Sequence, residues 1–197
     1  MPTTLNERKK LVLSASSFAL TVFCVLPALS APKKSTVSDM DKNFLIAANE
    51  SNVSEIAYAP VVMKRASSTS AKEFARHMVQ DHTKANKQVA TLARQLGVKL
   101  PQAVPDEEQA VIERLNQEHG AKFDAAYKAE MIRDHLEDIS DAEREVSLGS
   151  DPRVRALASQ LLVTLRGHLS MAKSMSAGVR QVDASATTTM SHDASMK

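Results

Sequence analysis

Three histidines and one glutamate are the residues of this chain whose types and positions point to metal chemistry. Each falls on, or at the edge of, an apolar stripe that recurs at helical spacing, and each belongs to a different long stretch of that kind. The four residues are Glu55, His82, His135 and His168. Each lies within about four residues, or roughly 6 Å, of the middle of its stretch, so the four side chains are expected at one level of a helical bundle. Imidazole nitrogens suit copper (Cu) and zinc (Zn), and the carboxylate would add an oxygen ligand.

A pentapeptide repeat places two methionines and two aspartates beside these histidines. The sequence MVQDH at 78–82 recurs as MIRDH at 131–135. Met and His at positions i and i+4 lie on one helix face, so each thioether could approach the ion that its histidine binds, which favours Cu(I). Adjacent Asp and His cannot face each other on their own helix, so each aspartate is expected to orient a group on a neighbouring helix. The methionines and aspartates concerned are Met78, Met131, Asp81 and Asp134.

The same histidines have two other interpretations. A histidine in the middle of a helix is often a hydrogen-bonded core residue, and a methionine at helical spacing often fills the core. Clustered imidazoles can also form a pH-responsive network, because they gain charge near pH 6 and then repel one another. His77 and His119 do not share the pattern, since His77 lies roughly 90° from the centre of its stripe and His119 lies near a connection.

Four long helices and one short helix are predicted to position these residues. They begin near Asp39, after the turn at 67–70, at Asp106, near Gly120 and after the cap at Asp151. The connection between the second and third long helices is long and suits a crossover better than a tight hairpin. The predicted fold is therefore an all-α four-helix bundle over residues 39–178, with a crossover connection that carries the short helix. The tail at 179–197 is rich in Ser, Thr, Ala and Asp and is predicted to be disordered.

The N-terminal residues 1–31 have the layout of a secretory signal peptide. Three cations precede an apolar run from Leu11 to Leu29, and small residues follow around Ser30. The alternative is an uncleaved membrane anchor, because the run is close to the minimum spanning length of roughly 17 residues. Cleavage would remove Cys24, the only cysteine, and would leave no transmembrane segment. The mature chain is then expected in the periplasm or in association with the outer membrane, without disulfides.

Charge and composition exclude several classes of function. Removing residues 1–31 takes away three cations and one acid and lowers the formal net charge from +2 to 0, so no basic patch for nucleic acid is expected. The five Phe, two Tyr and absence of Trp leave few side chains to stack on bases. The chain contains no nucleophile elbow, phosphate loop, dinucleotide fingerprint or CxxC pair. No catalytic residue can be named, and an enzyme is the less favoured interpretation.

Four segments carry a resemblance to a known family. They are FLIAANESNVSEIA, EFARHMVQDHTKANKQVATLARQLGV, KFDAAYKAEMIRDH and LLVTLRGHLSMAKSM. They are similar, over about residues 39–176, to the domain-of-unknown-function 4142 family of exported bacterial proteins, commonly labelled predicted outer-membrane proteins. The resemblance implies a ferritin-like four-helix bundle in the cell envelope and no established activity. The family positions that match are Glu55, Asp81, His82, Asp134, His135 and His168.

Two hypotheses for the function follow. The first is an exported bundle that binds a transition metal, Cu or Zn, or buries a histidine network, at the level of the three histidines and Glu55. The second is a bundle without metal that serves as a structural or partner-binding module, with envelope stress tolerance as one role. A partner would be an envelope protein or a second copy of the chain. Ferroxidase chemistry is not supported, because the second and fourth long helices lack the Glu-x-x-His pairs of di-iron sites.

Overall fold

The described part of the protein, residues 37–176 of a computed structural model, consists of α-helices and the turns that join them. Its helices are α1 (Asp39–Arg65), α2 (Thr69–Leu96), α3 (Asp106–Gln117), α4 (Gly120–Leu148) and α5 (Pro152–Ser174). Four long helices and one short one confirm the predicted all-α fold. Among these five, none combines the length and the apolar character that crossing a membrane requires. The signal peptide predicted for residues 1–31 and the tail predicted for 179–197 lie outside the described residues.

The helix ends follow from local capping chemistry. The Ser38 hydroxyl oxygen accepts a hydrogen bond from the backbone N–H of Asp41 at the start of α1. The Asp151 carboxylate accepts one from the backbone N–H of Arg153 at the start of α5. Gly97 ends α2 with a φ of 71°, a left-handed conformation that glycine adopts without steric cost. Residues with strong capping preferences therefore determine where these helices begin and end.

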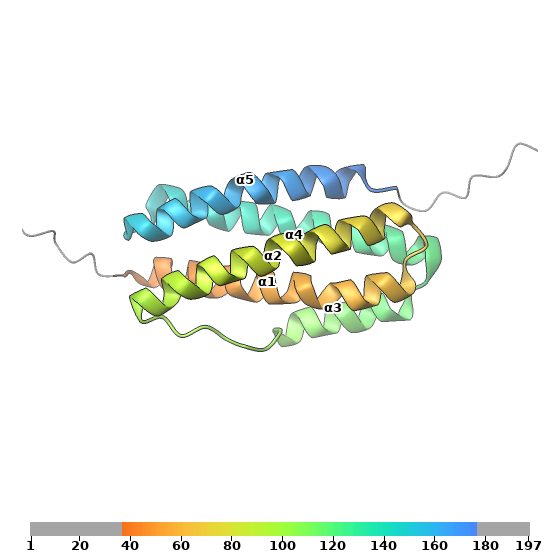
Figure 1. Cartoon of the computed structure of the whole chain (residues 1–197), viewed down its shortest axis with the longest axis horizontal. Coiled ribbons are helices and arrows are strands. Elements are labelled where there is room, and N and C mark those ends of the chain that lie inside the picture. Colours follow the sequence, from red (N-terminus) through yellow and green to blue (C-terminus); the bar gives the residue numbers. More distant parts are fainter. Residues whose placement is uncertain (1–36, 177–197) are drawn as a thin grey trace, which may run out of the picture. The chain divides into compact units, whose positions relative to one another are not determined.

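The four long helices form two antiparallel hairpins that pack against each other. Short turns join α1 to α2 and α4 to α5, while α1 faces α4 and α2 faces α5 (Figure 1). The long connection from Gly97 to His119 crosses the bundle, so α2 and α4 run in the same direction. It carries α3 along α1 and α4. This is the predicted crossover with its short helix.

Two apolar clusters fill the bundle, and a belt of polar residues lies between them. One cluster contains Tyr58, Phe74, Met78, Tyr127 and Met131, and the other contains Phe44, Val89, Ala142, Val154 and Leu165, each among further residues. On every long helix, buried polar side chains lie between the segments that belong to the two clusters. The three histidines and Glu55 are part of this polar belt and therefore share one level of the bundle. Apolar packing on both sides shields the belt from water.

Candidate metal centre

His82 of α2, His135 of α4 and His168 of α5 meet in the polar belt, and we call these three residues the histidine centre. Their ring centroids are separated by 5.2 Å (82 and 168), 5.3 Å (135 and 168) and 5.9 Å (82 and 135). One ligand nitrogen from each ring lies within 4.8 Å of those from the other two. None of the three residues is more than 3% exposed. Imidazoles from three different helices therefore meet in one small volume of the interior.

Each ring of the histidine centre uses one nitrogen in a hydrogen bond to an oxygen and leaves the other nitrogen free. The bonded pairs are His82 Nδ1 and Asn52 Oδ1 at 2.9 Å, His135 Nδ1 and the Met131 carbonyl oxygen at 2.9 Å, and His168 Nε2 and Asp81 Oδ2 at 3.0 Å. Because these oxygens accept, the ring nitrogens that face them carry the hydrogens. The free nitrogens, buried and without a hydrogen-bond partner among the described residues, are His82 Nε2, His135 Nε2 and His168 Nδ1. In a neutral ring that nitrogen presents an unshared electron pair.

The surroundings keep the imidazoles of the histidine centre neutral. Burial lowers the pKa of His82 well below its ordinary value, and the charges that neighbouring histidines would carry lower it further. Burial and His168 together lower the pKa of His135 to about 4. Burial also lowers the pKa of His168, although the bond to Asp81 opposes this. Three neutral rings with free electron pairs are in the form in which histidine binds a metal.

Residues on neighbouring helices orient two of the rings. Asp81 of α2 contacts His168 of α5, and Asn52 of α1 contacts His82 of α2. An oxygen bonded to the second ring nitrogen is the usual companion of a metal-bound histidine, because it fixes the tautomer and the ring direction. The orienting role expected for Asp81 fits its contact, whereas the role of Asn52 was not anticipated. Its position three residues before Glu55, on one helix face, is the signal that would have found it.

Glu55 lies behind His135, in a group of carboxyls from α1 and α4. Its Oε1 atom is 3.5 Å from His135 Nδ1, the nitrogen that is already bonded to Met131. Burial raises the pKa of Glu55 well above its ordinary value, and the charge of Asp134 raises it further. Burial likewise raises the pKa of Asp134 to about 6, and burial with the Asp134 charge raises that of Asp138 to about 8. Burial beside Asp134 therefore favours the neutral form of the Glu55 carboxyl.

Met78 and Met131 are fully buried in the apolar cluster that adjoins the histidine centre. Both pack in the cluster that contains Phe74 and Tyr127. The flexible methionine side chain commonly fills such irregular apolar space. The two methionines that were expected as sulfur donors are therefore part of the apolar core of the bundle.

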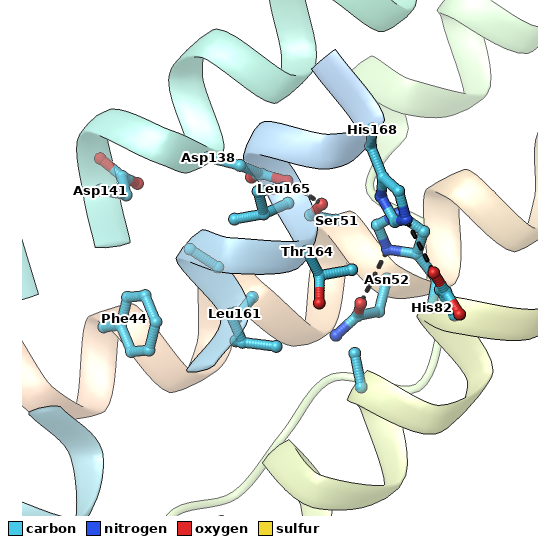
Figure 2. Close-up of a pocket in the computed structure, with 14 residues that line it drawn as sticks. Phe44, Ser51, Asn52, His82, Asp138, Asp141, Leu161, Thr164, Leu165 and His168 are labelled. Carbon is cyan, nitrogen blue, oxygen red and sulfur yellow. Dashed lines mark hydrogen bonds and ion pairs between the residues drawn. The ribbon is translucent and has the colours of Figure 1, made fainter. Parts of the chain in front are cut away.

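A cleft between the helices borders the histidine centre (Figure 2). His82 and His168 lie at one end of the cleft, and Phe44 lies at the other. Its lining combines polar side chains with apolar ones, and the small Ala48 and Ala85 are among the apolar ones. A water or another small molecule in this cleft would reach the edges of two of the three imidazoles.

A family model matches most of the chain. It describes a domain of unknown function, DUF4142, and it covers residues 26–175. The chain belongs to the DUF4142 family. The resemblance found in the four sequence segments is thereby confirmed. The description of DUF4142 assigns no activity, so the function must be argued from the histidine centre itself.

A solved structure shares the fold of this DUF4142 protein. It is the crystal structure of a DUF305 fragment from Deinococcus radiodurans, with a TM-score of 0.62 and 15% sequence identity. The match covers 70% of this chain and 95% of the fragment. At this identity the likeness supports the fold alone. A search of the curated proteins gave no match.

Proposed function

We propose that this DUF4142 protein binds one transition-metal ion, Cu or Zn, at the histidine centre. The observation that carries the proposal is the set of three buried ring nitrogens that lack a hydrogen-bond partner among the described residues. Buried polar atoms are nearly always paired, and each unpaired one costs about 1–3 kcal/mol. A metal ion would bind all three electron pairs at once and would remove that cost.

Three imidazoles suit an ion that keeps one coordination position open for another ligand. Three histidines with an external fourth ligand form one of the common catalytic zinc sites, and imidazole also suits copper. With metal–nitrogen bonds of about 2.0 Å, tetrahedral ligand nitrogens are about 3.3 Å apart. One nitrogen of each ring lies within 4.8 Å of one nitrogen of each of the other two, so modest ring movements would close the site. The cleft beside His82 and His168 has room for the fourth ligand.

In this proposal Glu55 is not the oxygen ligand that the sequence suggests. Its carboxyl lies beside the His135 nitrogen that carries the hydrogen, so we assign it no bond to the ion. A ring whose Nε2 binds a cation donates more strongly from Nδ1. Glu55 and the Met131 carbonyl oxygen would then both stabilise that hydrogen.

Metal titration of protein purified without a histidine tag tests the proposal. The chelator-treated protein is titrated with Cu²⁺ and with Zn²⁺ against a chromophoric competitor, beside the triple variant H82Q/H135Q/H168Q. We expect the wild type to bind one ion per chain, with Cu²⁺ held more tightly than Zn²⁺. The triple variant should bind no ion at the same concentrations. Glutamine keeps these positions polar, and far-UV circular dichroism checks that the variant remains helical.

His119 provides the matched control for this titration. It is an exposed histidine whose ring contacts Arg65 and not the histidine centre. The H119A variant should therefore bind metal like the wild type. Equal stoichiometry and affinity in the wild type and the triple variant would remove the proposal. The three histidines would then be a structural network, as the second hypothesis holds.

The double variant M78L/M131L tests whether sulfur takes part. Because both methionines pack in an apolar cluster, we expect the affinities for Cu(I) and Zn²⁺ to stay unchanged. A selective loss of Cu(I) affinity would instead assign a bond from a thioether to the ion.

We also propose that the protein works in the cell envelope. The support is the signal-peptide layout of residues 1–31 together with the export implied by the DUF4142 resemblance. Residues 1–31 fused to an alkaline phosphatase that lacks its own signal should give phosphatase activity in a bacterial periplasm. An inactive fusion that accumulates in the cytoplasm would contradict export.

A further inference from the structure

A second group of metal-binding side chains lies beside the histidine centre, between α2 and α5. His77 Nε2 is 3.2 Å from Asp81 Oδ2, and the same oxygen is 3.0 Å from His168 Nε2. The rings of His77 and His168 have centroids 5.5 Å apart. One ligand atom from each of the three residues lies within 4.8 Å of those from the other two. The His77 side chain is 44% exposed, that of Asp81 29% and that of His168 2%, so the group leads from the surface to the interior.

We propose that His77, Asp81 and His168 form a loading site that binds a transition-metal ion at the surface and passes it to the histidine centre. The proposal rests on the proposed function and adds the path by which the ion arrives. His168 belongs to both groups, because its Nε2 faces Asp81 while its Nδ1 is free. Binding at the loading site requires the ring hydrogen of His168 to move from Nε2 to Nδ1, and return of that hydrogen together with rotation of this one ring would transfer the ion inward. The helices themselves need not move.

The chemistry of the loading site suits first capture of a cation. Asp81 supplies a half-exposed carboxylate that attracts the ion, and His77 supplies an imidazole that solvent can reach. His77 also lines a surface pocket with Met171 and Met175, whose thioethers would favour copper. On a helical wheel of α2, His77 lies outside the apolar stripe. The α5 helix nevertheless brings the His168 ring next to the His77 ring. The loading site therefore needs two helices and cannot be seen from either alone.

The cleft beside the histidine centre is the competing route for the ion. It also borders His82 and His168, and Ala48 is part of its lining. Replacing Ala48 with leucine would narrow the cleft and leave the loading site unchanged. The pair of variants H77A and A48L therefore separates the two routes.

Stopped-flow absorbance of Cu²⁺ uptake measures the rate at which each variant is loaded. We expect H77A to load about tenfold more slowly than the wild type, because the local capture of the cation is lost. Its final stoichiometry should still be one ion per chain. A48L and the exposed-histidine control H119A should load at the wild-type rate. A wild-type rate in H77A, or slow loading in A48L alone, would overturn the proposal.

An equilibrium measurement tests the loading site without the histidine centre. The variant H82Q/H135Q keeps His77, Asp81 and His168, so it should retain one weak Cu²⁺ site, and adding H77A should abolish that site. Equal affinity in the wild type and H82Q/H135Q would show that the proposed function fails. Equal binding by H82Q/H135Q and H77A/H82Q/H135Q would show instead that the loading site fails.

Discussion

Two buried polar clusters of this bundle differ in how completely their hydrogen bonds are satisfied. The first, which we call the cap cluster, is the buried Asp41 carboxylate with its hydrogen-bond partners Ser38, Ser150 and Asp151. Asp41 is fully buried there, and each of its oxygens accepts two hydrogen bonds. In the histidine centre, by contrast, each ring keeps one nitrogen without a partner among the described residues.

This difference separates a structural polar cluster from a site that can take a ligand. The Asp41 carboxylate joins the start of α1 to the turn between α4 and α5, and its four bonds leave it no capacity for a ligand. Burial alone raises the pKa of Asp41, but its hydrogen bonds from Ser38 and Asp151 outweigh burial and lower it. Changes in the cap cluster should therefore alter stability and leave metal binding intact. Changes in the histidine centre should do the reverse.

Removing the Asp41 carboxylate should have the largest effect on stability. The D41A variant leaves four donors, partly or fully buried, without their acceptor, and we expect the free energy of unfolding to fall by about 4 kcal/mol. Urea denaturation followed by circular dichroism measures the loss. Asp39, in the same helical turn, has a side chain that is 91% exposed and provides the control, since D39A should leave stability nearly unchanged. A stability loss of similar size in both variants would contradict the role given to Asp41.

Gly149 should be the next most sensitive position of the same region. Its φ of −58° is open to any residue, so the need for glycine comes from a close approach. A Cβ at this position would overlap the Glu145 carboxyl and lie 2.6 Å from the Glu145 carbonyl oxygen. We expect G149A to lose about 2–3 kcal/mol by overpacking, measured by urea denaturation. G149A/E145A should recover only part of this, because the backbone contact remains. Wild-type stability in G149A would show that the turn accommodates the added methyl group without strain.

Glu145 should make stability depend on pH. Burial and the neighbouring Asp41 carboxylate together raise its pKa from 4.5 to about 7. Between these two values the native state keeps a proton that the unfolded state has lost, so stability falls as pH rises. We expect a decline of about 2 kcal/mol from pH 4.5 to 8 in the wild type, relative to E145Q. Parallel pH profiles in the two proteins would contradict the raised pKa.

The helices and the level of the histidines could be predicted because they depend on local patterns. Helical spacing of apolar residues, capping residues and glycines act within a few positions along the chain. The same spacing indicates that Glu55, His82, His135 and His168 lie at similar depth. These features need no knowledge of which helices are neighbours.

The partners of each ring could not be predicted, because they depend on which helices touch. A helical wheel shows in which direction His77 points from the axis of α2. It does not show that α5 packs on that side and places His168 beside His77. The position of Glu55 was also beyond prediction from the sequence. Its side chain points into the bundle as expected, but it interacts with Asp134 behind His135. Asn52 was missed because an amide has no charge to draw attention to it. Contact between helices, and not residue type, separates the proposed ligands from the supporting groups here.

Replacing His135 with leucine should have the smallest effect on stability and should disable metal binding at the histidine centre. Leucine removes a buried nitrogen that has no partner among the described residues and loses one bond, to the Met131 carbonyl oxygen. These effects oppose each other, so without metal the free energy of unfolding should change by about 1 kcal/mol or less. An ion at a thousand times its dissociation constant stabilises a protein by about 4 kcal/mol, and H135L should lose most of that gain because only the weak loading site remains. Urea denaturation with chelator and with saturating Zn²⁺ measures both quantities. If H135L without metal were destabilised as much as D41A, the histidine centre would be a structural cluster of the same kind as the cap cluster.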